Sequence, residues 1–337
     1  MIDYRSDTVT KPSKQMHEAM FSANVGDDVF GEDPSINQLQ QLAADMFGME
    51  AALFCPSGTM TNQIAIKCHT QPGDEVICEV SSHIYQYEGG GIAFNSGASV
   101  KLIYGDRGRI TAQDVQDAIN ADDVHKPHSS LVSLENTSNR GGGSCYELTE
   151  IEGIRQVCNE NNLMLHLDGA RLFNAVVAKK QSAKDYGRLF HSVSICLSKS
   201  LGCPVGSLVL GTKPFIKKAK RIRKAFGGGM RQAGYLAAAG IYALENNIQR
   251  LQQDHDHARL LAEALKKKDF VEEVFPVETN IIIFKVGGRF APQSLVAKMK
   301  EHDVLWYAIS PTQVRIVTHL DVTEEMIEKT IDIIEKL

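Results

Sequence analysis

A lysine and an aspartate follow two strand-like stretches that lie about one crossover apart. Lys199 comes after the apolar run 193–197, and Asp168 closes the run 164–168. The 31 positions from 168 to 199 fit one strand–connection–strand step, so both side chains are expected near one edge of a sheet. There, a lysine can form an imine with an aldehyde cofactor and a carboxylate can keep the cofactor's ring nitrogen protonated. The pair predicts pyridoxal phosphate, although either residue alone is more often a solvated charge or a turn residue.

A second signal precedes a helix-like stretch nearer the start of the chain. Residues 53–62 read Leu-Phe-Cys-Pro-Ser-Gly-Thr-Met-Thr-Asn and lead into the apolar run 63–67. Backbone N–H groups at such a helix start can bind an anion, and the helix dipole adds to the attraction. We therefore expect a phosphate-binding loop here, with an ordinary Ser/Thr-capped helix as the alternative.

Composition limits the classes of partner. The 337 residues carry a net charge of −5, and the basic stretch 213–224 spaces its charges as one solvated helix face would, so no nucleic-acid partner is expected. The seven cysteines form no C-x-x-C pair, and no signal-like or long apolar segment is present. These features predict reduced thiols, a cytoplasmic location and no membrane partner. No closely spaced ligand set predicts a metal site.

The elements expected to position these residues alternate between strands and helices. Asp33 is expected to cap a helix over 35–47, with Pro34 in its first turn. Short apolar strands are expected at 75–80, 100–104, 130–134, 164–168, 193–197 and 207–210, with helices at 111–121 and 149–161 between some of them. This alternation predicts an α/β fold with a mostly parallel central sheet covered by helices on both faces.

The last third of the chain has a different texture. Helical character is expected from 231 to 268, with His255 and His257 at its surface. Strands at 280–286 and 313–319 and helices at 292–302 and 323–337 then predict a smaller α+β unit. The expected division is an N-terminal arm of residues 1–15 that joins the small domain, a large cofactor-binding domain of residues 16–247 and a small C-terminal domain of residues 248–337.

Several motifs together resemble one enzyme family over nearly the whole chain. They are Arg-Ser-Asp-Thr-Val-Thr at 5–10, Gly-Asp-Asp-Val-Phe-Gly-Glu-Asp-Pro at 26–34, Pro-Ser-Gly-Thr-Met at 56–60, Glu-Asn-Thr at 135–137, His-Leu-Asp-Gly-Ala-Arg at 166–171, Leu-Ser-Lys at 197–199 and Gly-Gly-Met-Arg-Gln at 228–232. The chain resembles the low-specificity L-threonine aldolases. That resemblance implies pyridoxal phosphate, the aspartate-aminotransferase fold, and cleavage of β-hydroxy-α-amino acids to glycine and an aldehyde.

The resemblance also implies roles for individual residues. Lys199 forms the imine, Asp168 pairs with the ring nitrogen, Arg171 contacts the phenolic oxygen, and Gly58 and Thr59 hold the phosphate. The other implied site residues are His83 over the cofactor ring, Ser6 and Arg315 at the substrate carboxylate, His125 near the substrate hydroxyl, and Lys224 and Arg231 near the phosphate at a subunit boundary. A homotetramer built from dimers is expected.

Two positions depart from the family pattern, and some alternatives stay open. Phe30 stands where the family usually has tyrosine, and Ser200 stands where glycine is common. The base is His83, His125 or an ordered water, and His128 lies close enough in sequence to be confused with His125. An aminotransferase or β-eliminating lyase of the same fold remains an alternative activity, as does a non-catalytic carrier or regulator that binds the cofactor.

Overall fold

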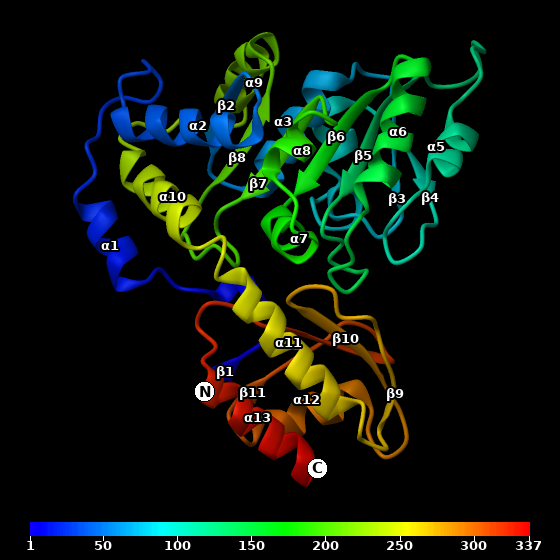
Figure 1. Cartoon of the computed structure of the whole chain (residues 1–337). Coiled ribbons are helices and arrows are strands. Elements are labelled where there is room, and N and C mark those ends of the chain that lie inside the picture. The colour runs from blue at the N-terminus through cyan, green and yellow to red at the C-terminus, as the bar shows by residue number, and fades with distance from the viewer.

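A seven-stranded sheet forms the centre of the larger part of the molecule (Figure 1). The computed structural model describes all 337 residues. Only β8 runs antiparallel to its neighbours, so the other six strands share one direction. Across the sheet the order is β2 (Ala51–Cys55), β8 (Ser207–Gly211), β7 (Ser192–Cys196), β6 (Met164–Gly169), β5 (Ser129–Glu135), β3 (Glu75–Glu79) and β4 (Ser99–Ile103). The predicted α/β fold with a mostly parallel sheet is confirmed.

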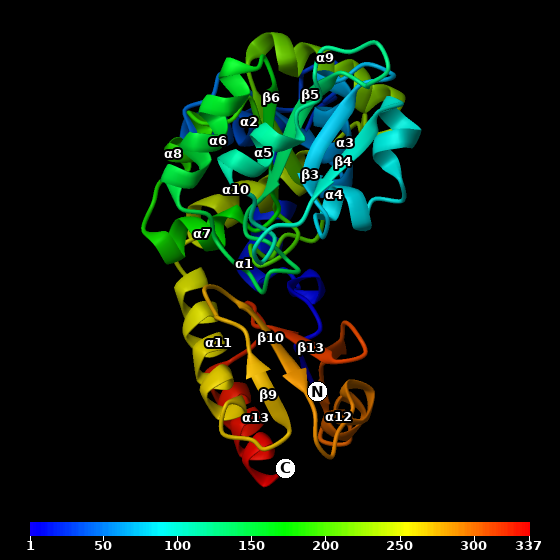
Figure 2. The same ribbon diagram turned by 90° about the vertical axis from the view of Figure 1, so that its right-hand side faces the viewer.

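Helices cover both faces of this sheet, and its strands β3, β5 and β7 are accordingly buried at every residue. One face packs against α3 (Gly58–His69) and α9 (Lys213–Ala225), with Ile64, Ala65 and Ile66 of α3 in the contact. The opposite face forms the largest apolar cluster with seven other helices of this part (Figure 2). These are α1 (Lys14–Phe21), α2 (Pro34–Phe47), α5 (Ala112–Ala118), α6 (Leu148–Glu160), α7 (Leu172–Lys179), α8 (Ala183–Gly187) and α10 (Gly234–Asn246).

Helix α2 begins and ends as its sequence predicts. The Asp33 carboxylate accepts from the Ile36 amide at 3.1 Å, and Pro34 occupies the first turn. Gly48 ends the helix with φ 61°, a left-handed conformation that glycine adopts without a Cβ penalty.

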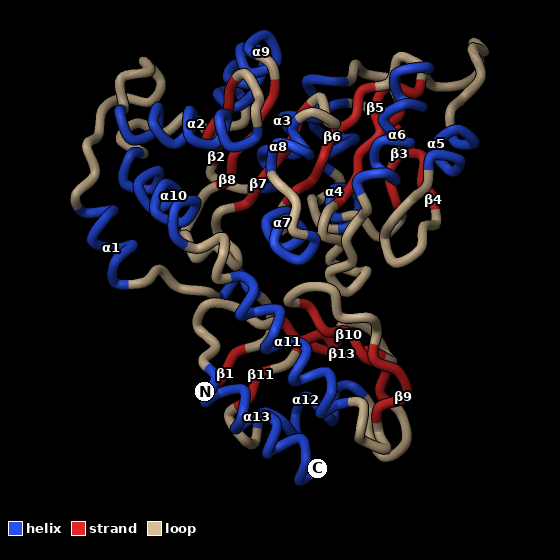
Figure 3. The backbone as a smooth tube through the Cα atoms, in the orientation of Figure 1, coloured by secondary structure: helices blue, strands red, loops and turns tan.

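The C-terminal part has its own core beneath the larger part (Figure 3). Its antiparallel sheet has the order β12 (Tyr307–Ala308), β13 (Gln313–Val317), β10 (Ile281–Val286) and β9 (Val271–Val274). Around this sheet lie α11 (Leu251–Leu265), α12 (Pro292–Lys300) and α13 (Glu324–Lys336). At the start of the chain, β1 (Ile2–Asp3) pairs with β11 (Val304–Leu305). The boundaries at residues 15 and 247 stay predictions.

Two expectations for the segment 231–268 are wrong. The helix is interrupted between α10 and α11 at residues 247–250. His255 and His257 are buried rather than exposed, because α11 packs against α7, α13 and the small sheet on several sides. His255 Nε2 lies 3.0 Å from Asn174 Oδ1. None of the helices combines the length and the apolar character that crossing a membrane requires.

Candidate active site

Three chain segments meet at one edge of the central sheet. Asp168 lies near the end of β6, Lys199 follows β7, and Gly58 and Thr59 begin α3 shortly after β2. Because β2, β6 and β7 run in the same direction, their carboxyl ends share this edge. The edge faces the C-terminal part of the molecule (Figure 1). The structure therefore brings together the predicted lysine, carboxylate and helix start.

Asp168 is buried and held at both carboxylate oxygens. Its Oδ1 accepts from the Ala170 amide at 3.1 Å, and its Oδ2 accepts from Asn62 Nδ2 at 2.9 Å. The same Asn62 nitrogen lies 2.9 Å from Glu88 Oε1. Asp168, Glu88 and His83 bring one polar atom each to within 4.8 Å of one another.

His83 begins α4 (His83–Gln86) and is fixed by two glutamates. Its Nδ1 lies 3.0 Å from Glu88 Oε1, and its backbone amide donates to Glu135 Oε2 at 2.7 Å. Burial works to lower the pKa of His83, but the Glu88 hydrogen bond and the charges of Asp168 and Glu88 outweigh it and raise the pKa. This leaves Nε2 as the ring nitrogen without a protein partner.

Glu135, at the end of β5, is a neighbour of the site that the sequence did not single out. Burial and the Asp168 charge raise the pKa of its carboxyl to about 7. The Asn139 and His83 amides both donate to it. Glu135 belongs to the Glu-Asn-Thr motif, which was the available signal. Asn62 is the last residue of the predicted phosphate loop but had no signal for contact with Asp168, and Glu88 had no signal at all.

Arg171 does not present a free guanidinium fork. Its Nε and Nη2 donate to the two oxygens of the buried Asp7 at 2.7 and 2.6 Å. The Ser200 hydroxyl donates to the same Asp7 carboxylate at 2.7 Å and accepts from Asn280 Nδ2 at 3.2 Å. Ser200, one of the two departures, thus stabilises Asp7, while only Nη1 of Arg171 remains for a phenolic oxygen.

Arg315 lies in β13, across from this edge, and is buried without a carboxylate partner. Its Nη1 donates to Asn139 Oδ1 at 2.7 Å, its Nη2 donates to the Arg5 carbonyl at 3.0 Å, and its Nε has no partner. Burial and the charge of Arg171 lower the pKa of Arg315 to about 10. A small anion beside this guanidinium would relieve both effects.

Ser6 lies next to the chain segment that Arg315 contacts. Its hydroxyl oxygen accepts from the amide and the hydroxyl of Thr8 at 3.2 and 2.9 Å, so it caps the short 3₁₀ turn Asp7–Val9. In this arrangement the hydroxyl proton of Ser6 remains available to a ligand, apart from a long 3.5 Å contact to Asp7.

The start of α3 has the groups that a phosphate requires. Ser57 caps the helix by accepting from the Met60 amide, so the amides of Gly58 and Thr59 are among those left without a helical partner. A Cβ on Gly58 would lie 3.6 Å from Ser207 Oγ, a buried hydroxyl with no partner. A free helix start beside an unsatisfied hydroxyl fits an anionic group.

The structure does not bring His125 to this cluster. Its side chain is 86% exposed and pairs with Asp123 in the loop between α5 and β5. That loop enters the amino end of β5, and it extends away from the C-terminal part in Figure 1. Since the strands are parallel, His125 lies toward the opposite edge from Lys199 of the same chain, and its role near the substrate hydroxyl stays a prediction.

Lys224 and Arg231 are exposed near the end of α9 and after it. Arg231 Nη1 donates to Asp27 Oδ2 at 2.8 Å, and its guanidinium lies 5.9 Å from the ring centre of Phe30. The intervening segment lies close to α3, because a Cβ on Gly228 would clash with Met60 Sδ. Neither cation forms an ion pair with Asp168.

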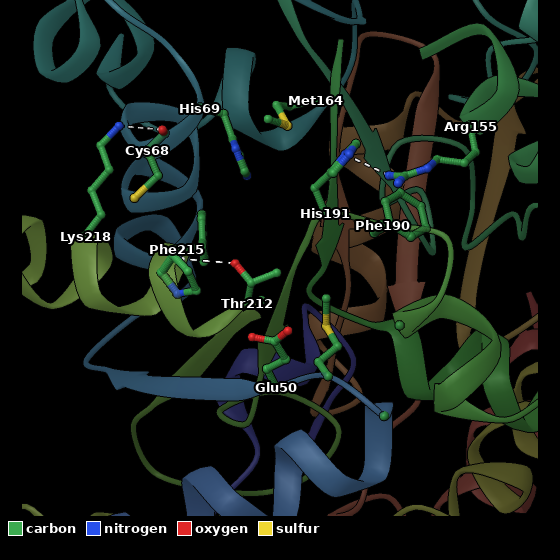
Figure 4. A pocket seen from close by; sticks show the side chains of 15 residues that line it. Glu50, Cys68, His69, Arg155, Met164, Phe190, His191, Thr212, Phe215 and Lys218 are labelled. Atoms are coloured by element: carbon green, nitrogen blue, oxygen red, sulfur yellow. Dashed lines mark hydrogen bonds between the residues drawn. The ribbon is translucent and has the colours of Figure 1, made fainter. Parts of the chain in front are cut away.

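A cavity of about 590 Å³ lies at the other edge of the sheet, where β6 and β7 begin (Figure 4). His69, His191, Arg155 and Lys218 line it, and none of the predicted site residues does. A much smaller cavity lies beside Lys199, between Arg171 and Ser200.

Comparisons with known proteins identify the family of this chain. A family model described as beta-eliminating lyase matches residues 3–288, which defines the class of protein. The low-specificity L-threonine aldolase of Escherichia coli K12 is 46% identical over 97% of this chain and 96% of its own length. Low-specificity L-threonine aldolase 1 of Arabidopsis thaliana is 40% identical, and the match covers 98% of this chain and 94% of that protein. This chain therefore belongs to the low-specificity L-threonine aldolase family.

Solved structures support the same fold. A threonine aldolase from Leishmania major superposes with a TM-score of 0.88 at 21% identity, covering 100% of this chain and 99% of that one. A serine palmitoyltransferase from Sphingomonas wittichii superposes with a TM-score of 0.77 at 14% identity, and the match covers 99% of this chain and 86% of that one.

Proposed function

We propose that this protein binds pyridoxal phosphate and cleaves L-threonine, L-allo-threonine and related β-hydroxy-α-amino acids to glycine and an aldehyde. The observation that carries the proposal is the placement of Lys199 and Asp168 at one sheet edge, opposite the guanidinium of Arg315, whose buried Nε has no partner. When bound, the cofactor accepts the electron pair released as the Cα–Cβ bond breaks.

Three parts of the edge would hold the cofactor. The amides of Gly58 and Thr59 bind its phosphate, and Lys199 Nζ supplies the amine that its aldehyde requires. Asp168, already oriented by Ala170 and Asn62, accepts from the protonated ring nitrogen. The Nη1 of Arg171, which Asp7 does not use, would donate to the phenolic oxygen.

The substrate carboxylate is assigned to Arg315. Its Nε is buried without a partner, and a guanidinium provides two parallel donors for a carboxylate. The Ser6 hydroxyl provides a further donor. Anchoring the carboxylate at β13 would keep the rest of the substrate directed toward Lys199.

His83 is the base in this proposal. Its Nδ1 is held by Glu88, so its Nε2 is directed away from that carboxylate and is free to accept the β-hydroxyl proton. Because Glu88 and Asp168 raise the pKa of His83, the neutral ring that can accept this proton is formed only above the raised pKa. A water held by His83 is the alternative base.

Aldehyde release tests this activity. Purified protein loaded with pyridoxal phosphate should produce acetaldehyde and glycine from L-threonine and L-allo-threonine without a 2-oxo acid. Conversion of the cofactor to its amine form by several amino acids would indicate an aminotransferase, and release of ammonia and a 2-oxo acid would indicate β-elimination. Cofactor binding without turnover of any amino acid would indicate a carrier.

We further propose a cytoplasmic homotetramer built from dimers. All seven cysteines are free, which suits a reducing compartment. Phe30 is 74% and Phe21 84% exposed, and such large apolar side chains favour burial against another copy. In the assembly Lys224 and Arg231 would approach a phosphate of a neighbouring copy. Sedimentation of the loaded protein should give a tetramer that loses cofactor on dilution, and a stable, fully active monomer would refute this assignment.

A further inference from the structure

One buried amide, that of Asn62, lies between two carboxylates of the site. Its Nδ2 is 2.9 Å from Asp168 Oδ2 and 2.9 Å from Glu88 Oε1. A carboxylate accepts hydrogen bonds and an amide nitrogen has two protons, so this nitrogen donates one proton to each neighbour. The amide therefore has one orientation, with Oδ1 directed away from both carboxylates.

The orientation of Asn62 in turn determines which ring nitrogen of His166 carries the proton. His166 Nε2 lies 3.2 Å from Asn62 Oδ1, and since Oδ1 only accepts, Nε2 must carry the proton. Burial lowers the pKa of His166 to about 4, so the ring is neutral near neutral pH and its Nδ1 is an acceptor. The Ser192 hydroxyl, 2.8 Å from Nδ1, donates to it.

The same chain of donors continues to the far edge of the sheet. Ser192 Oγ is 2.8 Å from His69 Nε2, which must then donate. Burial lowers the pKa of His69 to about 3, so this ring is neutral as well. His69 lines the cavity of Figure 4. Hydrogen-bond donors thus follow one direction from that cavity through Ser192, His166 and Asn62 to the site carboxylates.

We propose that Asn62, oriented by His166 and Ser192, is a positioning residue that aims Asp168 at the cofactor ring nitrogen. Through the same nitrogen it holds Glu88, and so His83, at a fixed distance from Asp168. The shared amide also reduces the repulsion between two closely spaced carboxylates. This inference rests on the proposed function and adds a residue to the site that it describes.

Ser192 gives the proposal a specific consequence. His166 Nδ1 also lies 3.2 Å from the Ser192 carbonyl oxygen. Without the Ser192 hydroxyl, the ring proton can move to Nδ1 and donate to that carbonyl, which leaves Nε2 facing Asn62 Oδ1 as a second acceptor. The amide would then rotate and lose its bonds to Asp168 and Glu88. A purely space-filling serine would have no such effect.

The test measures cofactor affinity and the visible absorbance of the bound cofactor against pH, using apoprotein titrated with pyridoxal phosphate. Asn62→Leu, which keeps the volume but removes both donors, should weaken cofactor binding about tenfold. In this variant the pH at which the absorbance of the bound cofactor changes should be lower than in wild type, because a misdirected Asp168 holds the proton on the ring nitrogen less firmly. Ser192→Ala should shift both measurements in the same direction by a smaller amount.

Gln63→Leu is the matched control. Gln63 lies on the same helix and donates to Glu88 Oε2 at 2.6 Å, but it does not contact Asp168. Its cofactor affinity and absorbance profile should stay within about twofold of wild type. Shifts as large as those of Asn62→Leu would overturn the proposal.

Two outcomes separate this inference from the proposed function. If the wild-type chain does not bind pyridoxal phosphate, the proposed function fails. If the wild-type chain binds it but Asn62→Leu leaves affinity and absorbance unchanged, only the positioning role is overturned. Should Asn62→Leu not fold, Ser192→Ala decides, and an unchanged profile in that variant is equally contrary.

Discussion

The two edges of the central sheet place histidines in opposite environments. At the carboxyl edge, Glu88 and Asp168 raise the pKa of His83. At the amino edge, burial lowers the pKa of His69 to about 3 and that of His191 to about 4, with nearby cationic groups adding to the effect. The same side chain is therefore kept protonated to higher pH at one edge and neutral at the other.

The difference lies in what surrounds each edge. Buried acids gather at the carboxyl edge, whereas Arg155, Lys218 and one carboxylate, Glu50, line the cavity at the amino edge. Arg155 contacts His191 and Lys218 donates to the Cys68 carbonyl, so neither cation is paired with a carboxylate. A protonated ring nitrogen needs a carboxylate beside it, and a phosphate needs free amides. At the carboxyl edge the buried Asp168 and the start of α3 come together, so a spacious cavity is a weaker guide to the chemistry than the groups around it.

The largest difference in turnover should appear when one lysine at each edge is replaced by alanine. Lys199→Ala should lower turnover by more than about a thousandfold, because the phosphate loop cannot replace the amine. It should still bind the cofactor weakly. Lys218→Ala, at the amino edge, should leave turnover within about twofold. Initial rates of aldehyde release measure both, and the reverse pattern would move the chemistry to the cavity.

Breaking the buried Asp7–Arg171 ion pair at the carboxyl edge should destabilise the fold more than breaking an exposed pair. Asp7→Asn should lower the free energy of unfolding by roughly 3–5 kcal/mol, because it leaves the buried Arg171 charge without its partner. Asp256→Asn, in an exposed pair with Arg259, should cost about 1 kcal/mol or less. Denaturant unfolding at pH 7 compares the two. Equal losses would mean that the Asp7–Arg171 pair is solvated rather than buried.

Replacing Arg315, which lies opposite the sheet edge, should chiefly affect substrate binding. Arg315→Ala should raise KM roughly 10- to 100-fold, the range expected for lost charged hydrogen bonds. Its effect on kcat should be smaller, because carboxylate binding is common to the ground and transition states. Lys285→Ala, an exposed cation on the paired strand β10, should change neither. An unchanged KM in Arg315→Ala would remove this residue from the substrate site.

The two edges should also give stability opposite dependence on pH. His69, with its pKa lowered to about 3 from 6.5, binds fewer protons folded than unfolded between these values, so its contribution rises with pH there. Glu135, raised from 4.5 to about 7, binds more protons folded, so its contribution falls with pH over that range.

Unfolding free energies from pH 4.5 to 6.5 test these signs. Relative to wild type, His69→Gln should make stability rise less steeply with pH, and Glu135→Gln should make it rise more steeply. Shifts of the same sign in both variants would contradict the contrast between the edges.

Local signals predicted the frame of the site but not its connections. Lys199, Asp168 and the start of α3 follow from strand ends and a helix cap, which are encoded by neighbouring residues. Asn62 and Glu88 join Asp168 only through the packing of α3 against the sheet, which the spacing of residues does not reveal. The prediction that His255 is exposed was wrong, because the spacing of residues along a helix does not show how many sides of α11 are covered by other elements.

The central claim is that the cofactor lies at the carboxyl edge, joined to Lys199. Reducing the loaded protein with borohydride and mapping the modified peptide tests it most directly. The account predicts a single reduced adduct on Lys199. An adduct on Lys218 at the amino edge, on Lys67 or Lys224, or on no lysine would contradict it.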